Sequence, residues 1–167
     1  MTLAAPALAP ACPSCGRGAA TPSRAPRLFD PGPADGAARV TTPEDLAELV
    51  VPPLTGLDRE HCLLVSLDTK HHVLAVTTVS IGSAAHTFME PREVFRDALL
   101  AGAVAVAVAH NHPSGDPDPS PEDRAVTRRL ARAGEVLGVA LLDHLVVGRS
   151  RWRSLARTEP RLLRPGG

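Results

Sequence analysis

Residues 103–123 read AVAVAVAHNHPSGDPDPSPED and join an apolar run to two histidines, a stiff Pro/Gly loop and the start of a helix. The apolar run predicts a strand that leads into the two histidines. In a strand, residues i and i+2 point to the same side of the sheet. His110 and His112 can therefore aim both imidazoles at one point.

The segment after the loop has the features of a helix N-terminus. Ser120 is a suitable N-cap, Pro121 suits the first helical position, and acidic residues follow in the first turn. Asp123 can return a carboxylate from this helix to the histidines. Two nitrogen donors, one oxygen donor and a free fourth position describe a catalytic zinc site rather than a closed structural one. The alternative is that Ser120 and Asp123 form only a capping pair, with an acidic residue at N3 in place of the usual Glu or Gln.

The complete spacing resembles the JAMM motif of the MPN+/JAB metallopeptidases. Seven residues separate the second histidine from the serine, two more separate the serine from the aspartate, and a proline directly follows the second histidine. The flanking stretches PREVF (residues 91–95) and LDH (residues 142–144) are similar to the RadC-type branch in particular. The resemblance covers about residues 43–158.

By this resemblance, His110, His112 and Asp123 are zinc ligands, and Ser120 hydrogen-bonds the metal-bound water or the developing oxyanion. The expected cofactor is Zn²⁺, which lowers the pKa of its bound water to about 7 and polarises the scissile carbonyl. The expected activity is therefore hydrolysis of a peptide, isopeptide or related amide bond. The expected partner is a peptide or protein substrate.

The resemblance also implies an acid/base glutamate upstream of the motif, and three residues compete for this role. Glu60 directly precedes the first predicted core strand, and REHC (residues 59–62) matches the position of this glutamate in the RadC pattern. Glu90 and Glu93 lie at the start of a predicted helix, where the helix dipole already explains an acidic residue. We therefore expect Glu60 to accept the proton of the water and to pass it to the leaving amine.

A second interpretation belongs to a different class of protein, namely a DNA-repair-associated or protein-interaction domain with a structural or vestigial zinc site. The best local argument for nucleic acid is the series of arginines at positions 149, 151, 153, 157, 161 and 164. Trp152 is the one aromatic residue among them, so a solvated basic tail over residues 159–167 is the preferred interpretation. The intact ligand set and the candidate glutamate favour the enzyme.

The composition is typical of one small domain. The chain has 167 residues, and its 18 basic and 18 acidic residues give a net charge of zero. Bulk electrostatics therefore predict neither nucleic-acid nor membrane binding. Three cysteines cannot make a fully paired disulfide framework. The N-terminus lacks a basic region before its apolar residues, and no apolar run reaches transmembrane length. We expect a cytoplasmic protein.

Residues 1–40 are dominated by Ala, Pro and Gly and predict a disordered tail without a role in the fold. Cys12 and Cys15 form a CxxC within it, which suggests half of a zinc knuckle or a redox pair. No second pair lies nearby, so metal binding is not the preferred interpretation. The folded domain is expected over residues 41–158.

The predicted elements of this domain follow from periodicity and from helix-start and turn signals. They are a helix over 42–50 ended by Pro52-Pro53, strands over 62–67 and 73–79, a helix from Pro91 to Gly102, the strand 103–109, a helix over 120–137, a closing strand of 139–142 and 145–147, and an edge strand over 151–153. They make a mixed α/β domain. In the helix from Pro91, one face is expected to carry Val94, Phe95, Ala98 and Leu99, and the helix over 120–137 is expected to turn Val126, Leu130, Ala133 and Leu137 towards the core. The resemblance implies an MPN/JAB-like, cytidine-deaminase-like three-layer arrangement, with helices packed on a twisted, partly antiparallel sheet.

The remaining histidines have weaker functional signals. His71 and His72 occupy the turn between two predicted strands and are expected to be solvated. His86 lies in a linker, where an ordinary loop histidine is the preferred interpretation. His144 interrupts an apolar strand, where it either contacts a metal ligand from behind or makes a structural hydrogen bond within the sheet.

Overall fold

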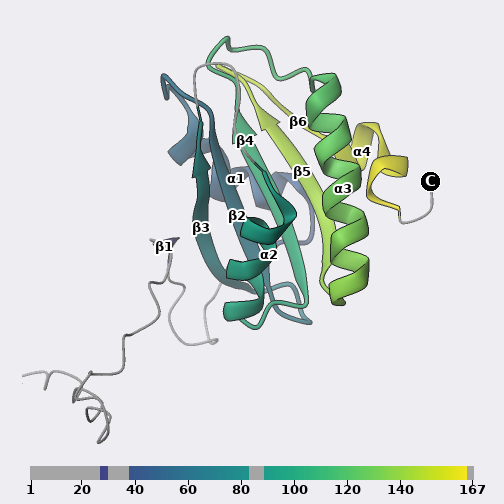
Figure 1. Ribbon diagram of the computed structural model, residues 1–167. Coiled ribbons are helices and arrows are strands. Elements are labelled where there is room, and N and C mark those ends of the chain that lie inside the picture. Colours follow the sequence, from purple (N-terminus) through teal and green to yellow (C-terminus); the bar gives the residue numbers. More distant parts are fainter. Residues whose placement is uncertain (1–26, 30–37, 83–88, 165–167) are drawn as a thin grey trace, which may run out of the picture.

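The computed structural model describes residues 27–29, 38–82 and 89–164, which form a six-stranded mixed sheet with helices on both faces (Figure 1). The strand order is β1-β3-β2-β4-β5-β6, with β4 and β5 parallel and the other neighbours antiparallel. The strands are β1 (Arg27–Phe29), β2 (His61–Leu67), β3 (Val73–Ile81), β4 (Ala105–Asn111), β5 (Ala140–Val147) and β6 (Trp152–Ser154). The helices are α1 (Pro43–Leu54), α2 (Pro91–Leu100), α3 (Pro121–Leu137), α4 (Leu155–Thr158) and the 3₁₀ helix η1 (Pro160–Leu163).

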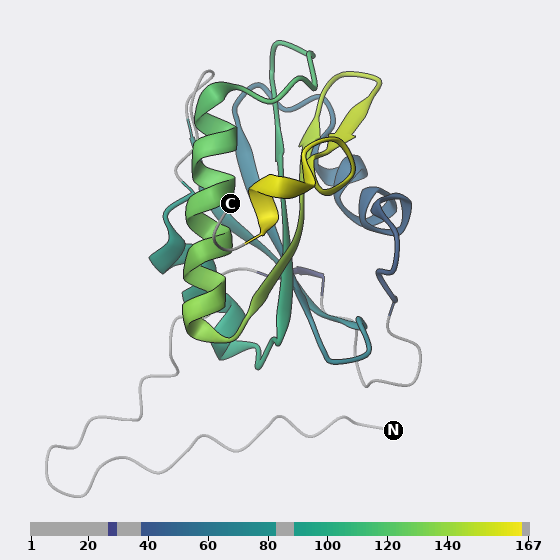
Figure 2. The same ribbon diagram turned by 90° about the vertical axis from the view of Figure 1, so that its right-hand side faces the viewer.

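The expected mixed α/β architecture with three layers is confirmed. Seen from the side, α1 covers one face of the sheet, and α2 and α3 cover the other (Figure 2). Each face therefore has its own apolar core, one beneath α1 and one beneath α2 and α3.

The central strand β4 divides its side chains between these two cores. Its alanines pack towards α1, whereas Val106 and Val108 belong to the core beneath α2 and α3. Because side chains in a strand alternate with a period of two, His110 continues the row of Val106 and Val108. The first histidine of the motif therefore faces α3, at the end of β4 from which the loop leads into that helix.

Helix α1 begins as predicted but ends later. Thr42 and Asp45 form a capping box, and Pro43 occupies the first turn. The helix then continues through Pro52 and Pro53 to Leu54, although these prolines were expected to end it. Leu54 is buried in the core beneath α1, and both the backbone N–H and the hydroxyl of Thr55 donate to the Val51 carbonyl. We attribute the extra turn to this burial and these bonds, which offset the hydrogen bonds that the prolines remove.

Helix α2 buries most of its predicted face. Val94, Phe95 and Ala98 are buried, as expected. Leu99 was placed on the same face, but its side chain is 51% exposed. The prediction for Leu99 was wrong because it lies next to Ala98 in sequence and is rotated past the edge of the helix–sheet contact.

Helix α3 is rotated relative to the predicted apolar face. Leu130 is fully buried as expected, but Leu137 is 44% exposed. The buried face also contains two polar residues, Asp123 and Thr127, together with Gly134. The apolar pattern gave the wrong rotation because polar residues of the candidate site occupy the inner face of the first two turns.

The sheet and its covering helices extend beyond the expected bounds 41–158 on both sides. Val40 is buried, its backbone N–H donates to His71, and the Ala38 carbonyl accepts from Val73. β1 pairs with β3, so two pieces of the predicted tail lie on the sheet. On the C-terminal side, Leu162 is buried within η1, which was expected to be part of a basic tail.

Several earlier expectations concern residues outside the described ranges. Cys12, Cys15 and His86 are among them. In the ranges that the structure does describe, no helix is both long enough and apolar enough to cross a membrane.

Candidate metal centre

Three side chains converge where β4 ends and α3 begins. The Nε2 atoms of His110 and His112 are 3.0 Å apart. Asp123 places Oδ1 3.1 Å from Nε2 of His110 and Oδ2 3.3 Å from Nε2 of His112. One ligand atom from each residue lies within 4.8 Å of the others, so this group can hold a metal ion.

The fold accounts for this convergence. β4 contains His110, and His112 directly follows its last residue. Both histidines lie on the side of the sheet that α3 covers. Asp123 is the third residue of α3 and belongs to its buried face. The capping box at the start of α3 fixes the first helical turn, and with it the direction of the carboxylate.

Burial and charge favour an anionic ligand at Asp123. Burial acts to raise the pKa of Asp123, but hydrogen bonds with His110 and His112 outweigh it and hold this pKa well below its usual range. The pKa of His112 is raised, chiefly by its hydrogen bond with Asp123. An ionised carboxylate thus faces two imidazoles, which together match the nitrogen and oxygen donors that zinc prefers.

Each imidazole uses its other nitrogen for a protein hydrogen bond. Nδ1 of His112 lies 2.7 Å from the Asp116 carbonyl oxygen, to which it donates. Nδ1 of His110 lies 2.8 Å from Nε2 of His144, which is fully buried on β5. Burial lowers the pKa of His144 to about 3, and the neighbouring His110 adds to this shift. His144 therefore contacts a candidate ligand from behind, one of the two roles expected for it.

Ser120 takes part in the capping box that was considered as its alternative role. Its Oγ accepts from the backbone N–H of Asp123 at 3.0 Å and donates to Oδ2 of Asp123 at 2.6 Å. The backbone N–H of Ser120 donates to the same oxygen at 2.7 Å. Ser120 thus lies directly beside the candidate ligand group and also orients its carboxylate.

Glu60 lies at the neighbouring strand end and is 8% exposed. Register pairs Cys62 of β2 with His110 of β4, so the chain just before β2 runs beside the end of β4. The side chain of Asn111 holds this chain in place. Its Oδ1 accepts from the backbone N–H of His61 at 2.8 Å, and its Nδ2 donates to the Arg59 carbonyl at 2.9 Å.

The charge of Glu60 reaches the ligand group. After the hydrogen bonds with Asp123 and with the Asp116 backbone, attraction to the Glu60 carboxylate also contributes to the raised pKa of His112. The two competing glutamates have other partners. Glu90 pairs with Arg129 at 3.1 Å, and Glu93 pairs with Arg96 at 2.9 Å.

A cleft of about 280 Å³ opens beside His112. Leu54 and Leu57 form part of its apolar lining, and Asn111 and Arg149 contribute polar groups. His112 is the most exposed of the three candidate ligands, with 15% of its side chain accessible, whereas His110 is fully buried. Of the three candidate ligands, His112 is the one that lines this cleft.

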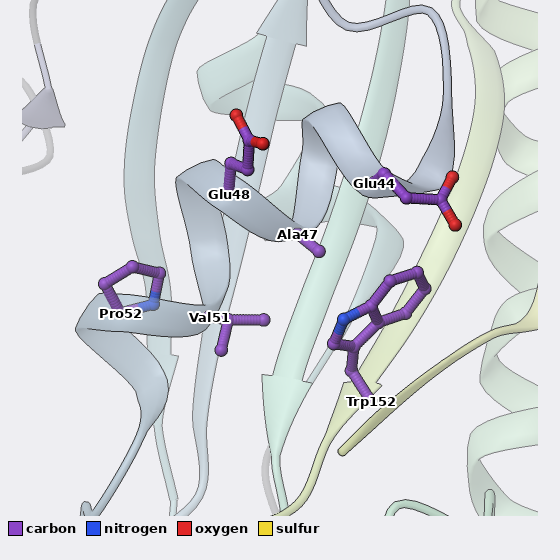
Figure 3. Close-up of a pocket in the computed structure, with 6 residues that line it drawn as sticks. All are labelled: Glu44, Ala47, Glu48, Val51, Pro52 and Trp152. Atoms are coloured by element: carbon purple, nitrogen blue, oxygen red, sulfur yellow. The ribbon is translucent and has the colours of Figure 1, made fainter. Parts of the chain in front are cut away.

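A second hollow of about 370 Å³ lies between α1 and the indole of Trp152 (Figure 3). Ala47 and Val51 line it together with Trp152, and the carboxylates of Glu44 and Glu48 stand at its border (Figure 3). It shares no residue with the candidate metal group or with the cleft beside His112.

Comparison with known families agrees with this geometry. The model of the RadC-like JAB domain matches residues 40–160. This chain belongs to the RadC-like JAB domain family.

Curated relatives of this RadC-like JAB domain are UPF0758 proteins. The protein of Desulfitobacterium hafniense (strain DSM 10664 / DCB-2) is 47% identical over 116 residues, which are 70% of this chain and 51% of that protein. The Moorella thermoacetica protein is 49% identical over 116 residues, with the same two shares. The Shouchella clausii protein is 49% identical over 109 residues, or 65% of this chain and 47% of the relative. The chain spans about half the length of the curated relatives it matches.

Two contacts of this RadC-like JAB domain were not predicted from its sequence. Thr127 lies one helical turn after Asp123, and this i, i+4 spacing was an available signal that both residues share the inner face. Asn111 stands between the two histidines and points to the other side of the sheet edge, towards β2. Its role depends on strand pairing, for which the local sequence offers no signal.

Proposed function

We propose that this RadC-like JAB domain is a zinc-dependent hydrolase that cleaves a peptide, isopeptide or related amide bond. The observation that carries the proposal is the convergence of His110, His112 and Asp123 beside a cleft. Three protein ligands, which leave a fourth position for water or substrate, are the arrangement of catalytic rather than structural zinc sites.

The donor set fits zinc in its chemistry as well as its number. Nε2 of His110 and Nε2 of His112 face one carboxylate, and both Nδ1 atoms are engaged by the protein. Such outer hydrogen bonds orient imidazole ligands and set their tautomers. A bound zinc ion supplies Lewis acidity, which activates water at neutral pH and polarises a carbonyl.

Glu60 is the residue to which we assign the proton transfers. Its carboxylate accepts a proton from the attacking water and later gives it to the leaving amine. The assignment is supported by the burial of Glu60, by its electrostatic effect on His112 and by the clamp that Asn111 makes on the residues around it. Ser120 donates to the developing oxyanion when its hydroxyl turns from Asp123, a contribution of about 3 kcal/mol for a single donor.

The cleft beside His112 is the surface to which we assign substrate binding. Its mixed polar and apolar lining suits an extended chain that brings its scissile carbonyl next to His112. Arg149 offers hydrogen-bond donors at the same place. A protein or peptide substrate fits these features.

The experiment compares the zinc-loaded protein with its Glu60→Gln variant on a library of peptides and isopeptides. The variant is expected to keep one zinc ion per chain and to lose about 10²-fold or more in hydrolysis rate. Glu90→Gln is the matched control, because Glu90 is an exposed partner of Arg129 and should retain full activity. A zinc-loaded wild-type protein that cleaves no amide in the library would contradict the proposal.

Asn111 provides an independent test of the position of Glu60. Asn111→Ala removes the two hydrogen bonds that its side chain makes with residues 59–61 and leaves the three candidate ligands intact. We expect zinc content to stay at one ion per chain. The hydrolysis rate should fall at least about 10-fold, because a displaced catalytic group no longer has the geometry that the reaction needs. Unchanged hydrolysis in this variant would show that Glu60 needs no such clamp.

A further inference from the structure

A chain of three hydrogen bonds runs from one candidate ligand to another behind the metal group. Nδ1 of His110 lies 2.8 Å from Nε2 of His144, and Nδ1 of His144 lies 2.7 Å from Oγ1 of Thr127. The Thr127 hydroxyl donates to the backbone carbonyl of Asp123 at 2.6 Å. His110, His144 and Thr127 are each 0% exposed, so water does not compete for these bonds.

The direction of each bond follows from the number of protons. A threonine hydroxyl has one proton, and here the Asp123 carbonyl receives it. Oγ1 of Thr127 is thus an acceptor towards His144, which must carry a proton on Nδ1. If His110 binds metal through Nε2, it keeps its own proton on Nδ1 and donates it to Nε2 of His144. His144 then accepts on Nε2 and donates on Nδ1.

This assignment of protons is consistent along the whole series of hydrogen bonds. Nδ1 of His110 and both ring nitrogens of His144 each have one partner, and Oγ1 of Thr127 has two. The ring of His110 is left with its Nε2 lone pair directed at His112 and Asp123. The last bond ends on the backbone of Asp123, so the same chain ties the first turn of α3 to β5. The orientation of His110 on β4 is therefore coupled to that of Asp123 on α3.

We propose that His144 and Thr127 are positioning residues that fix the metal-binding tautomer of His110. The inference rests on metal binding at the proposed site and extends it to two residues that do not touch the metal. Removal of such a partner typically costs about 10- to 100-fold in metal affinity.

A matched pair of substitutions at Thr127 separates this role from packing. Thr127→Ser keeps the hydroxyl and removes a methyl group, whereas Thr127→Val keeps the shape and removes the hydroxyl. We expect Thr127→Ser to bind zinc within about 3-fold of wild type and Thr127→Val to lose about 10- to 100-fold, measured by competition with a chelator. Equal affinities for the Val variant and wild type, or an equal loss in both variants, would overturn the proposal.

A spectroscopic readout on the wild-type protein keeps the proposal testable even if Thr127→Val does not fold. Long-range ¹H–¹⁵N spectra of the zinc-loaded protein report which nitrogen of His144 bears the proton. The proposal requires the proton on Nδ1, and a proton on Nε2 overturns it. Failure to bind zinc would overturn both proposals, whereas zinc binding with the expected tautomer but no hydrolysis would contradict the proposed function alone.

Discussion

His144 shows how one buried residue serves both the sheet and the candidate site. It lies within an apolar strand, and its two ring nitrogens reach a candidate ligand and a helix residue. A buried imidazole with both nitrogens hydrogen-bonded avoids the cost of an unpaired polar group. In this position, His144 stays neutral in the folded protein at pH values where a solvated histidine is charged.

Because burial lowers the pKa of His144 to about 3, this residue makes stability depend on pH. Below pH of about 6.5, the unfolded chain takes up a proton at His144 that the folded protein does not. Stability therefore falls as the pH decreases towards 3, by at most about 1.4 kcal/mol per pH unit. We expect metal-free His144→Gln to lose about 1.6 kcal/mol less than wild type between pH 6.5 and 5 in denaturant titrations. Parallel pH profiles of the two proteins would contradict this.

The spacing of His110, His112 and Asp123 was enough to predict that they meet, because a strand alternates and a helix start has a fixed geometry. The role of Thr127 and the clamp of Asn111 could not be predicted in the same way. They depend on the register of β4 against β5 and β2, which is set by tertiary packing. Local patterns therefore indicate the ligands and single out His144, but they do not give the roles of Thr127 and Asn111.

At the level of elements, α3 joins the candidate site to the core. Its first turns bring Asp123 and Thr127 to the sheet, and its last turns pack closely against the segment that follows. A Cβ on Gly134 would overlap the Val139 carbonyl oxygen and would lie 3.1 Å from Cζ of Phe95 on α2. Periodicity predicted the bounds of α3, but its rotation depends on these close contacts and on the polar site residues.

Gly134→Ala tests how tightly this helix is held. In an exposed helix, alanine stabilises by about 1 kcal/mol relative to glycine. Here we expect the free energy of unfolding to fall by about 1–3 kcal/mol, because the new methyl group must displace backbone. Urea titration measures the change, with Arg132→Ala on the exposed face of α3 as a control that should differ little from wild type. A stabilised Gly134→Ala variant would contradict the close packing.

At the scale of the whole molecule, the three layers were predictable and the limits of the folded unit were not. Composition placed residues 38–40 in a tail, yet their backbone pairs with the turn between β2 and β3. Similarly, η1 follows a run of arginines but buries Leu162 against the core of α4 and β5. Short edge segments of this kind take their structure from the sheet beside them rather than from their own sequence.

The N-terminal limit can be tested with two truncated chains, one beginning at Ala38 and the other at Thr41. The shorter chain loses the buried side chain of Val40 and the backbone hydrogen bonds with His71 and Val73. We expect it to be less stable by about 2–4 kcal/mol, from lost apolar burial and lost hydrogen bonds. Equal urea midpoints for the two chains would show that residues 38–40 contribute nothing to the fold.

The central claim is that one zinc ion binds to His110, His112 and Asp123, and metal analysis of the purified protein tests it most directly. His71→Asn is the matched control, because the β2–β3 turn lies at the opposite end of the sheet from the end of β4. We predict one zinc ion per chain in wild type and in His71→Asn, and less than about a tenth of this in the His110→Ala/His112→Ala double variant. Stoichiometric zinc in a folded double variant would contradict the account.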